Sequence, residues 1–174
     1  MKAMKKVLVS ALAAALVVTA AAPAGAATSP VKAPKAINGK ATVKGVTVKT
    51  SKKGTATVTA VKSKKAIVKV AATIKVKGVT YKVTAIGANA FKNCKKVKKI
   101  SVGKNVKTIG KNAFKGCKKL KTITLANKKV TIKKGAFAGL NTKKITIKAP
   151  KMSKKALKKF KKALKKAGFK GKVK

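Results

Sequence analysis

The sequence predicts an α/β repeat solenoid with an N-terminal β-hairpin cap and a C-terminal amphipathic helix. Three observations lead to this prediction. Apolar residues recur every 23 positions in the middle of the chain, upstream residues alternate as in strands, and a lysine-rich segment near the end has helical periodicity. A hydrophobic content of 45% in 174 residues is ample for one folded core, which argues against a disordered chain.

The first 26 residues have the pattern of a secretory signal peptide. Three lysines within residues 1–6 precede an uncharged run at 7–22, and a site of small residues follows at 24–26. A transmembrane anchor is the alternative, but the run is short, rich in alanine and followed by a cleavage-like site. Residues 27–41 are then expected to form a flexible linker. We therefore expect an extracytoplasmic protein that is secreted or associated with the cell surface.

Residues 42–82 are predicted to form a β-rich N-terminal cap. The segments 55–61 and 66–76 are rich in Val, Thr and Ile, and apolar residues alternate cleanly in the second segment. The pair Lys77 and Gly78 then turns the chain into a further strand, as in a β-hairpin. We expect this region to cover the end of the repeat core, and a separate binding domain is the alternative.

Residues 83–150 contain about three repeat units, and each unit ends in a predicted strand. The strands lie at residues 98–102, 121–125 and 144–148. The third unit has one residue fewer before its strand, so we interpret it as a degenerate terminal repeat. The positions that recur are Ile86, Ile109 and Ile132; Ala90, Ala113 and Ala136; and Phe91, Phe114 and Phe137. Such a period is typical of stacked coils.

Alternate side chains of a strand point to opposite faces, so each repeat strand has a core face and an exposed face. Ile100, Ile123 and Ile145 begin the apolar sets that are expected in the core. The opposite face is exposed and forms a candidate ligand face. Its residues are Lys99, Ser101, Thr122, Thr124, Lys144 and Thr146.

The strings IGANAFKNCKKVKKISV and IGKNAFKGCKKLKTITL resemble the units of bacterial BspA-type leucine-rich repeats, which carry the pattern IGxxAFxxCxxLxxIxI. The resemblance covers residues 83–150. It implies short parallel strands on a concave face, turns or short helices on the convex face, and a secreted or surface-attached protein that acts in adhesion. It implies no catalytic residues. This chain departs from the usual pattern in having few repeats and no acidic residues.

Cys94 and Cys117 occupy equivalent positions in neighbouring units. Stacking brings their backbones close together, so a disulfide between them is sterically allowed in an oxidising compartment. The other interpretation is a ladder of two buried free thiols, because equivalent side chains of a solenoid point inward in parallel.

Residues 151–174 are predicted to form a cationic C-terminal helix and tail. Ser153 is a suitable N-cap and Gly168 a suitable stop, and at about 100° per residue the apolar and basic side chains between them separate completely. The basic side comprises Lys154, Lys155, Lys158, Lys159, Lys161, Lys162, Lys165 and Lys166. Two interpretations stay open, which are a capping helix docked on the last repeat and an antimicrobial-type helix on a membrane surface.

The charged residues are all lysine, and the formal net charge is +48 because Asp, Glu, His and Arg do not occur. General acid–base catalysis needs a group that titrates near neutrality, normally a histidine or a tuned carboxylate. Ca²⁺ and Mg²⁺ prefer carboxylate oxygens, and tetrahedral zinc without histidine needs more than two cysteines. We therefore expect no enzyme activity, no cofactor and no metal site.

The lysine excess predicts a partner that supplies negative charge. We expect a protein that binds polyanions, which include teichoic acid, anionic lipid, acidic glycan and extracellular DNA, with an affinity that falls with salt. The alternative is a membrane-active protein that works through its C-terminal helix. Without arginine, recognition is expected to be broad, because lysine makes no two-point contact with phosphates or base edges. We expect a monomer with no small-molecule substrate.

Overall fold

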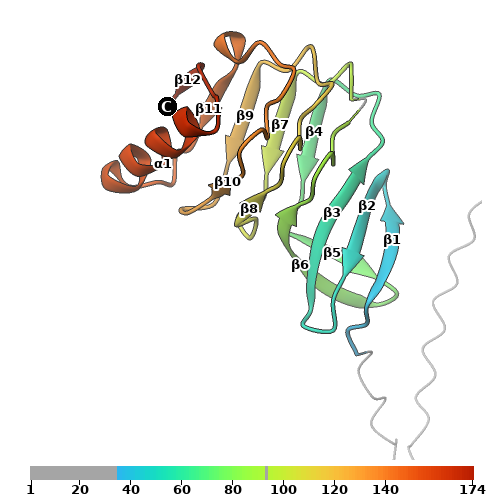
Figure 1. Cartoon of the computed structure of the whole chain (residues 1–174). Coiled ribbons are helices and arrows are strands. Elements are labelled where there is room, and N and C mark those ends of the chain that lie inside the picture. Colours follow the sequence, from blue (N-terminus) through green and yellow to red (C-terminus); the bar gives the residue numbers. More distant parts are fainter. Residues whose placement is uncertain (1–34, 93) are drawn as a thin grey trace, which may run out of the picture. The chain divides into compact units, whose positions relative to one another are not determined.

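The computed structural model describes residues 35–92 and 94–174, which form two β-sheets, one α-helix and one 3-10 helix (Figure 1). Sheet A has the order β1-β2-β3-β6-β8-β10, with β5 also beside β6, and sheet B has the order β12-β11-β9-β7-β4. The strands of sheet A are β1 (Gly39–Val43), β2 (Val46–Thr50), β3 (Thr55–Val61), β5 (Thr73–Val76), β6 (Val79–Ile86), β8 (Thr108–Ile109) and β10 (Thr131–Ile132). The strands of sheet B are β4 (Ile67–Val70), β7 (Lys99–Val102), β9 (Thr122–Leu125), β11 (Thr146–Lys148) and β12 (Lys172–Val173). The predicted signal peptide, residues 1–26, lies outside the described residues.

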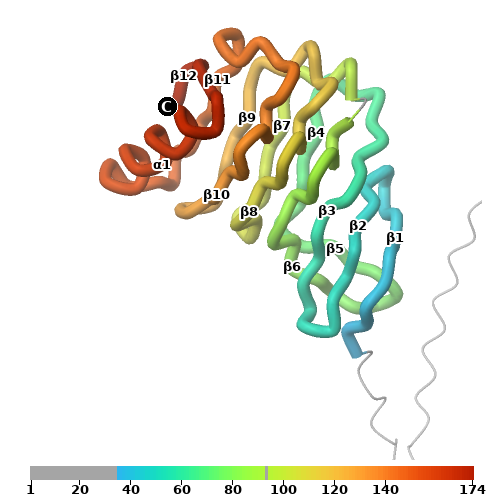
Figure 2. The backbone as a smooth tube through the Cα atoms, viewed as in Figure 1, coloured from blue at the N-terminus to red at the C-terminus, as the bar shows by residue number. Residues whose placement is uncertain are grey.

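Successive coils of the chain lie side by side, and each middle coil contributes one strand to each sheet (Figure 2). The chain runs from β7 in sheet B to β8 in sheet A and returns to sheet B at β9. The stacked strands pair in parallel, and Ile86, Ile109 and Ile132 are successive neighbours in sheet A. The predicted period of 23 residues is therefore the step from one coil to the next.

The core lies between the two sheets and includes the repeat positions. Phe91, Phe114 and Phe137 are buried and form a stack, in which neighbouring ring centroids are 5.5 Å apart. Phe169, from the segment that follows the helix, adds a fourth ring at 5.0 Å from that of Phe137. Stacked or tilted aromatic pairs at this separation contribute beyond their buried area, so the ladder stabilises the contact between coils.

Two tight hairpins precede the regular coils. The turn between β1 and β2 contains Lys44 and Gly45, with φ of 49° and 76°, and the predicted turn at Lys77 and Gly78 has φ of 47° and 79°. Two successive positive φ values are the geometry of type I′ turns, which match the twist of paired strands. Gly39 to Ala41, which the sequence placed in the flexible linker of residues 27–41, belong to β1 instead. The hydrogen bond from the Ile37 amide to the Tyr81 hydroxyl, 2.9 Å, holds the start of this strand.

The segment 66–76 forms two strands in different sheets rather than one. The chain leaves sheet B after β4 and enters the β5–β6 hairpin. The Ala72 carbonyl between them accepts hydrogen bonds from the Val83 amide, 2.9 Å, and from the Asn105 side chain, 3.0 Å. Both β3 and β4 pair in parallel with strands of the next coil, so residues assigned to the cap at 42–82 already take part in the stack.

The last coil is one residue longer than the coil before it, whereas the sequence predicts a coil that is one residue shorter. Ile147, and not Ile145, is the neighbour of Ile123 in sheet B, and the 3-10 helix η1 (Thr142–Lys144) accommodates the difference. Alternation did not determine this register, because a shift of two residues keeps every side chain on the same face. Ile145 is buried at its actual position as well.

The α-helix, α1 (Lys154–Lys166), packs against the end of the stack by its apolar side. The Ser153 hydroxyl accepts a hydrogen bond from the Ala156 amide at 3.3 Å, and Phe160 and Leu164 are buried. Gly168, with φ of 83°, then turns the chain back, and β12 pairs with β11. No helix in the described part of the chain is both long and apolar enough to cross a membrane.

Candidate anion-binding surfaces

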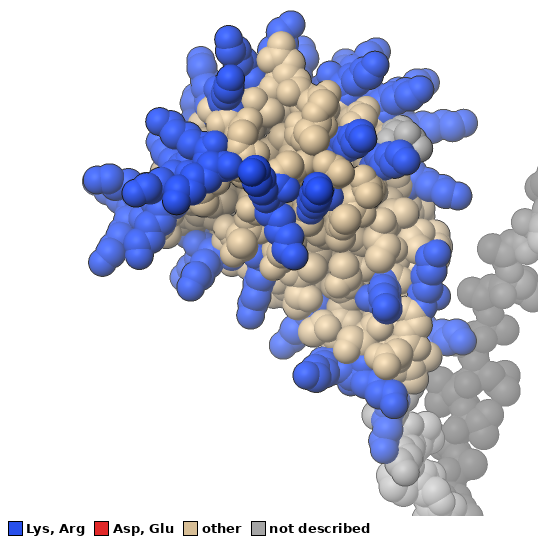
Figure 3. Space-filling model, viewed as in Figure 1, with Lys and Arg blue, Asp and Glu red and all other residues tan. Residues whose placement is uncertain are grey.

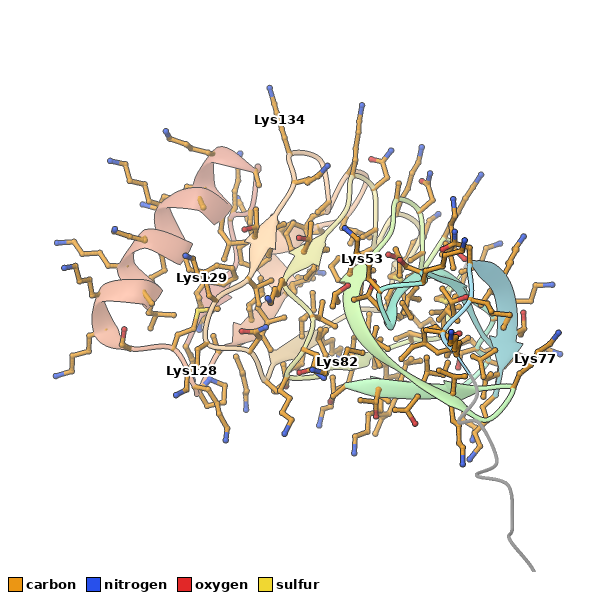
Figure 4. The ribbon with its side chains drawn as sticks, turned by 90° about the horizontal axis from the view of Figure 1, so that it is seen from below. Lys53, Lys77, Lys82, Lys128, Lys129 and Lys134 are labelled. Atoms are coloured by element: carbon orange, nitrogen blue, oxygen red, sulfur yellow. The ribbon has the colours of Figure 1, made fainter. Side chains whose placement is uncertain are left out.

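Every lysine that the structure describes is exposed. In the face shown by Figure 3, lysines gather over α1 and along the edge at which the strands of sheet B begin, whereas other residues occupy the middle. In Figure 4, Lys77 and Lys134 project away from the ribbon. Because the chain contains no acidic side chain, the protein itself neutralises none of these charges.

The predicted ligand face is the outer surface of sheet B. Parallel pairing places Lys99, Thr122 and Thr146 in one row, and Ser101 and Thr124 in a second row. The prediction is wrong for two residues, because the last strand is shifted by two positions from its predicted alignment. Thr146 lies beside Thr122 rather than Thr124, and Lys144 lies outside the strand, in η1. The rows are extended by Ile67, Lys172, Lys69 and Lys148.

A second lysine surface, which the sequence analysis did not single out, lies where the strands of sheet B begin. It comprises Lys95, Lys96, Lys98, Lys118, Lys119, Lys121, Lys143 and Lys144, and we call it the lysine edge. Ladder hydrogen bonds fix its backbone: the Lys121 amide donates to the Lys98 carbonyl, and the Thr146 amide donates to the Lys121 carbonyl, both at 2.8 Å. The repeated strings CKKVK and CKKLK were the sequence signal for this surface.

The lysine edge contains a cleft of about 620 Å³ at the point where the last coil departs from the repeat. Five lysines line this cleft, namely Lys98, Lys118, Lys119, Lys121 and Lys144. Leu120 and Ile145 also line it, and both are almost fully buried, so the lysines extend from a well-packed base. Charges closer together than the Debye length of about 8 Å act jointly on a ligand. The cleft is therefore suited to an anionic group.

Cys94 and Cys117 are free and buried in the structure. Each thiol donates a hydrogen bond to a carbonyl of the preceding coil, Cys94 to Val61 at 3.2 Å and Cys117 to Phe91 at 3.4 Å. Burial raises the pKa of the Cys94 thiol, and burial together with the neighbouring Cys94 raises the pKa of Cys117 to about 12. Both thiols are therefore protonated at neutral pH and poor nucleophiles.

The predicted basic side of α1 is exposed along its whole length, while Phe160 and Leu164 on the other side are buried. The docked helix thus presents its ammonium groups to solvent, and it presents Phe160 and Leu164 to the stack. Among residues 35–92 and 94–174, no group of three or more His, Cys, Asp or Glu side chains comes together as a metal site would require.

Comparison with known proteins points to one family. The family model described as BspA type leucine rich repeat region (6 copies) matches residues 80–174, which is more than half of the chain. The match extends beyond residues 83–150, where the sequence analysis placed the repeats, and it includes α1 and β12. A comparison with curated proteins gives no match.

Solved structures of leucine-rich repeat proteins resemble the chain. A leucine-rich repeat protein from Bacteroides capillosus ATCC 29799 is 26% identical, with a TM-score of 0.58, and the alignment covers 66% of this chain and 86% of that one. A leucine rich cell surface protein from Faecalibacterium prausnitzii A2-165 is 25% identical, with a TM-score of 0.52, and the alignment covers 63% of this chain and 32% of that one. These similarities confirm the predicted leucine-rich-repeat fold.

Proposed function

Because the chain belongs to the BspA-type leucine-rich repeat family, we propose that it is a secreted or surface-associated, non-enzymatic protein that binds polyanionic surfaces through its lysines. The family supports a role in adhesion or in binding macromolecules. One similar structure is described as a cell surface protein, which supports an extracytoplasmic location. The partner would supply the negative charge that this chain lacks.

The lysine edge is the observation that carries this proposal. Neighbouring strands of a sheet lie about 4.8 Å apart, so lysines of successive coils stand closer together than the Debye length of about 8 Å. Their mutual repulsion opposes folding, and a bound polyanion would relieve it. A polymer that runs along the stack would meet lysines from Lys95 to Lys144 in succession.

The surface chemistry favours recognition of charge over recognition of bases. All five phenylalanines and Tyr81 are buried, so the described residues offer no exposed aromatic ring on which a base could stack. Arginine is absent, which removes two-point contacts with base edges. Teichoic acid, anionic lipid, acidic glycan and extracellular DNA all satisfy this chemistry, and the first of these offers a slender chain of phosphates.

The two ends of the stack serve as caps in this proposal. β1 and β2 extend sheet A beyond the first coil, with Val48 fully buried, and α1 covers the other end with Phe160 and Leu164. An exposed repeat end would leave apolar core residues in water, so such covers stabilise a short solenoid. The membrane-active alternative requires α1 to undock, because its long apolar side chains are engaged in the core.

The proposal is tested by binding the purified protein to isolated bacterial cell walls over a series of NaCl concentrations. We expect retention at low salt and release at high salt, with the logarithm of affinity falling linearly with the logarithm of salt. Walls from which teichoic acid has been extracted are the matched control, and they should retain less protein. Binding that does not respond to NaCl would refute the proposal.

A further inference from the structure

An apolar groove of about 310 Å³ lies between α1 and the strand β10. Val130 and Ile132 of the stack form one side of the groove, and residues of α1 and of the segment just before it form the other. The helix-side apolar residues are Met152, Ala156, Phe160 and Ala163. Ala163 is exposed and Met152 and Ala156 are half-exposed, so the groove is open to solvent.

The groove exists because α1 docks by only part of its apolar surface. Phe160 and Leu164 reach the core and hold the helix against the stack. Ala156 and Ala163 lie farther round the helix and end at Cβ, so they do not fill the space toward β10. Apolar surface therefore stays accessible beside a firmly anchored helix.

Three lysines line the same groove and place positive charge next to the apolar surface. Lys128 and Lys129 precede β10, where Figure 4 shows them close to α1, and Lys159 belongs to the helix. Each of the three is exposed. No acidic side chain exists in the chain to pair with them.

We propose that this groove binds a single-chain anionic amphiphile. The acyl chain would lie against Val130, Ile132 and Phe160, and the carboxylate or phosphate head would meet Lys128, Lys129 and Lys159. Small-molecule sites range from about 300 to 1,000 Å³, so the groove suits one chain. Burying apolar surface and pairing an anion with lysine together favour such a ligand over a purely polar or purely apolar one.

The ligand is a dissolved amphiphile rather than a lipid within a bilayer. Insertion of α1 into a bilayer needs the side chains of Phe160 and Leu164, which are buried in the core. This binding is also distinct from polyanion binding, because a chain of charged groups has no apolar segment for the groove. It departs from the sequence-based expectation that the protein engages polymers and surfaces alone.

The test is calorimetric titration of the purified protein with dodecanoate below its micelle concentration. We expect one site per protein, and no comparable binding of dodecyltrimethylammonium, which has the same chain and the opposite charge. The variant Ala156→Leu/Ala163→Leu fills the groove and should bind dodecanoate at least about tenfold more weakly. The control Ala88→Leu, at another exposed alanine, should bind as the parent does.

Head-group recognition is tested by the triple variant Lys128→Gln/Lys129→Gln/Lys159→Gln. Its matched control, Lys154→Gln/Lys158→Gln/Lys162→Gln, removes the same charge from lysines of α1 that do not line the groove. We expect a loss of about tenfold for the first and little change for the second. Circular dichroism melts would verify that all variants fold. The proposal would be overturned if the two triple variants lost the same dodecanoate affinity. It would also be overturned if Ala156→Leu/Ala163→Leu bound dodecanoate as well as the parent does.

Vesicles containing an anionic phospholipid distinguish a dissolved amphiphile from a bilayer lipid as the occupant of the groove. The groove-filled variant should bind these vesicles, and teichoic-acid-containing walls, as the parent does, because those contacts involve surface lysines elsewhere. If filling the groove instead abolished vesicle binding and left dodecanoate binding intact, the occupant would be a bilayer lipid and the proposal would be wrong.

Discussion

The middle coils and the C-terminal end of this solenoid share one core but differ in regularity. From β7 to β10 the chain repeats the same step, and the cysteine and phenylalanine ladders run through it without interruption. At the C-terminal end, η1 lengthens the coil and Leu140 takes the place of cysteine. The chain then forms α1 instead of another repeat coil. The clefts of about 620 and 310 Å³ both involve this end. Regular stacking thus stabilises the protein and places its surface lysines in rows, whereas the irregular C-terminal end forms the two concave sites.

The largest difference between the two regions should appear when aromatic rings are removed from the ladder. Phe114→Ala deletes a ring that stacks on both sides, at 5.5 Å from each neighbour, and should cost about 3–5 kcal/mol. Phe169→Ala deletes the terminal ring, which has one ring neighbour, and should cost less, at about 3 kcal/mol, the lower end of that range. Urea unfolding of both variants measures the two costs. Equal costs would contradict the view that the ladder is weaker at its end.

Gly→Ala substitutions should also destabilise the middle coils more than the C-terminal end, and the difference in stability should be smaller than for the phenylalanines. A Cβ at Gly110 would lie 2.8 Å from the Ala88 amide nitrogen of the neighbouring coil, so Gly110→Ala should cost about 2 kcal/mol. A Cβ at Gly139, near the last coil, meets nothing within 4 Å, and only its φ of +73° opposes alanine, at about 1 kcal/mol. Thermal unfolding of the two variants tests this order. A Gly139→Ala variant that is the less stable of the two would show that close stacking is not the dominant constraint.

Lysine substitutions test whether polyanion binding depends more on the cleft, where the repeat is interrupted, than on the regular coils. Lys118→Gln/Lys119→Gln/Lys144→Gln removes three charges from the cleft, and Lys95→Gln/Lys96→Gln/Lys99→Gln removes three from the regular coils. The cleft variant should lose about tenfold in affinity for teichoic-acid-containing walls at low salt, and the other variant about threefold. Co-sedimentation at several NaCl concentrations gives both values. Identical losses would mean that total charge, and not its arrangement, determines binding.

Sequence reasoning succeeded where the physical constraint is local and repeated. The positions of Phe91, Phe114 and Phe137 follow from spacing alone, because a solenoid brings residues one period apart into contact. It failed at the last strand, because a two-residue shift exchanges Ile145 for Ile147 without changing the face of any side chain. Alternation carries no information about such a shift.

The candidate sites were less predictable than the fold. The outer face of sheet B was identified with only Thr146 and Lys144 misplaced, since period-two alternation defines it. The lysine edge required knowing that Lys98 and Lys121 stack at the start of neighbouring strands, which depends on where each strand begins. The groove beside α1 was not predictable, because periodicity shows that a helix has an apolar side but not which part of that side meets its neighbour.

The smallest expected effect concerns the thiol ladder, which belongs to the regular coils and ends before Leu140. The pKa of Cys117 is raised to about 12 from an ordinary value near 9, so the folded state favours the protonated thiol. The resulting stabilisation is fully present below pH 9 and is lost as the pH rises through about 12. The free energy of unfolding of the parent should therefore approach that of Cys117→Ala as the pH increases from 8 to about 11. All other side chains are the same in the two proteins, so the difference between their free energies of unfolding isolates the thiol. A constant difference over this range would show that Cys117 is not shielded by the coils around it.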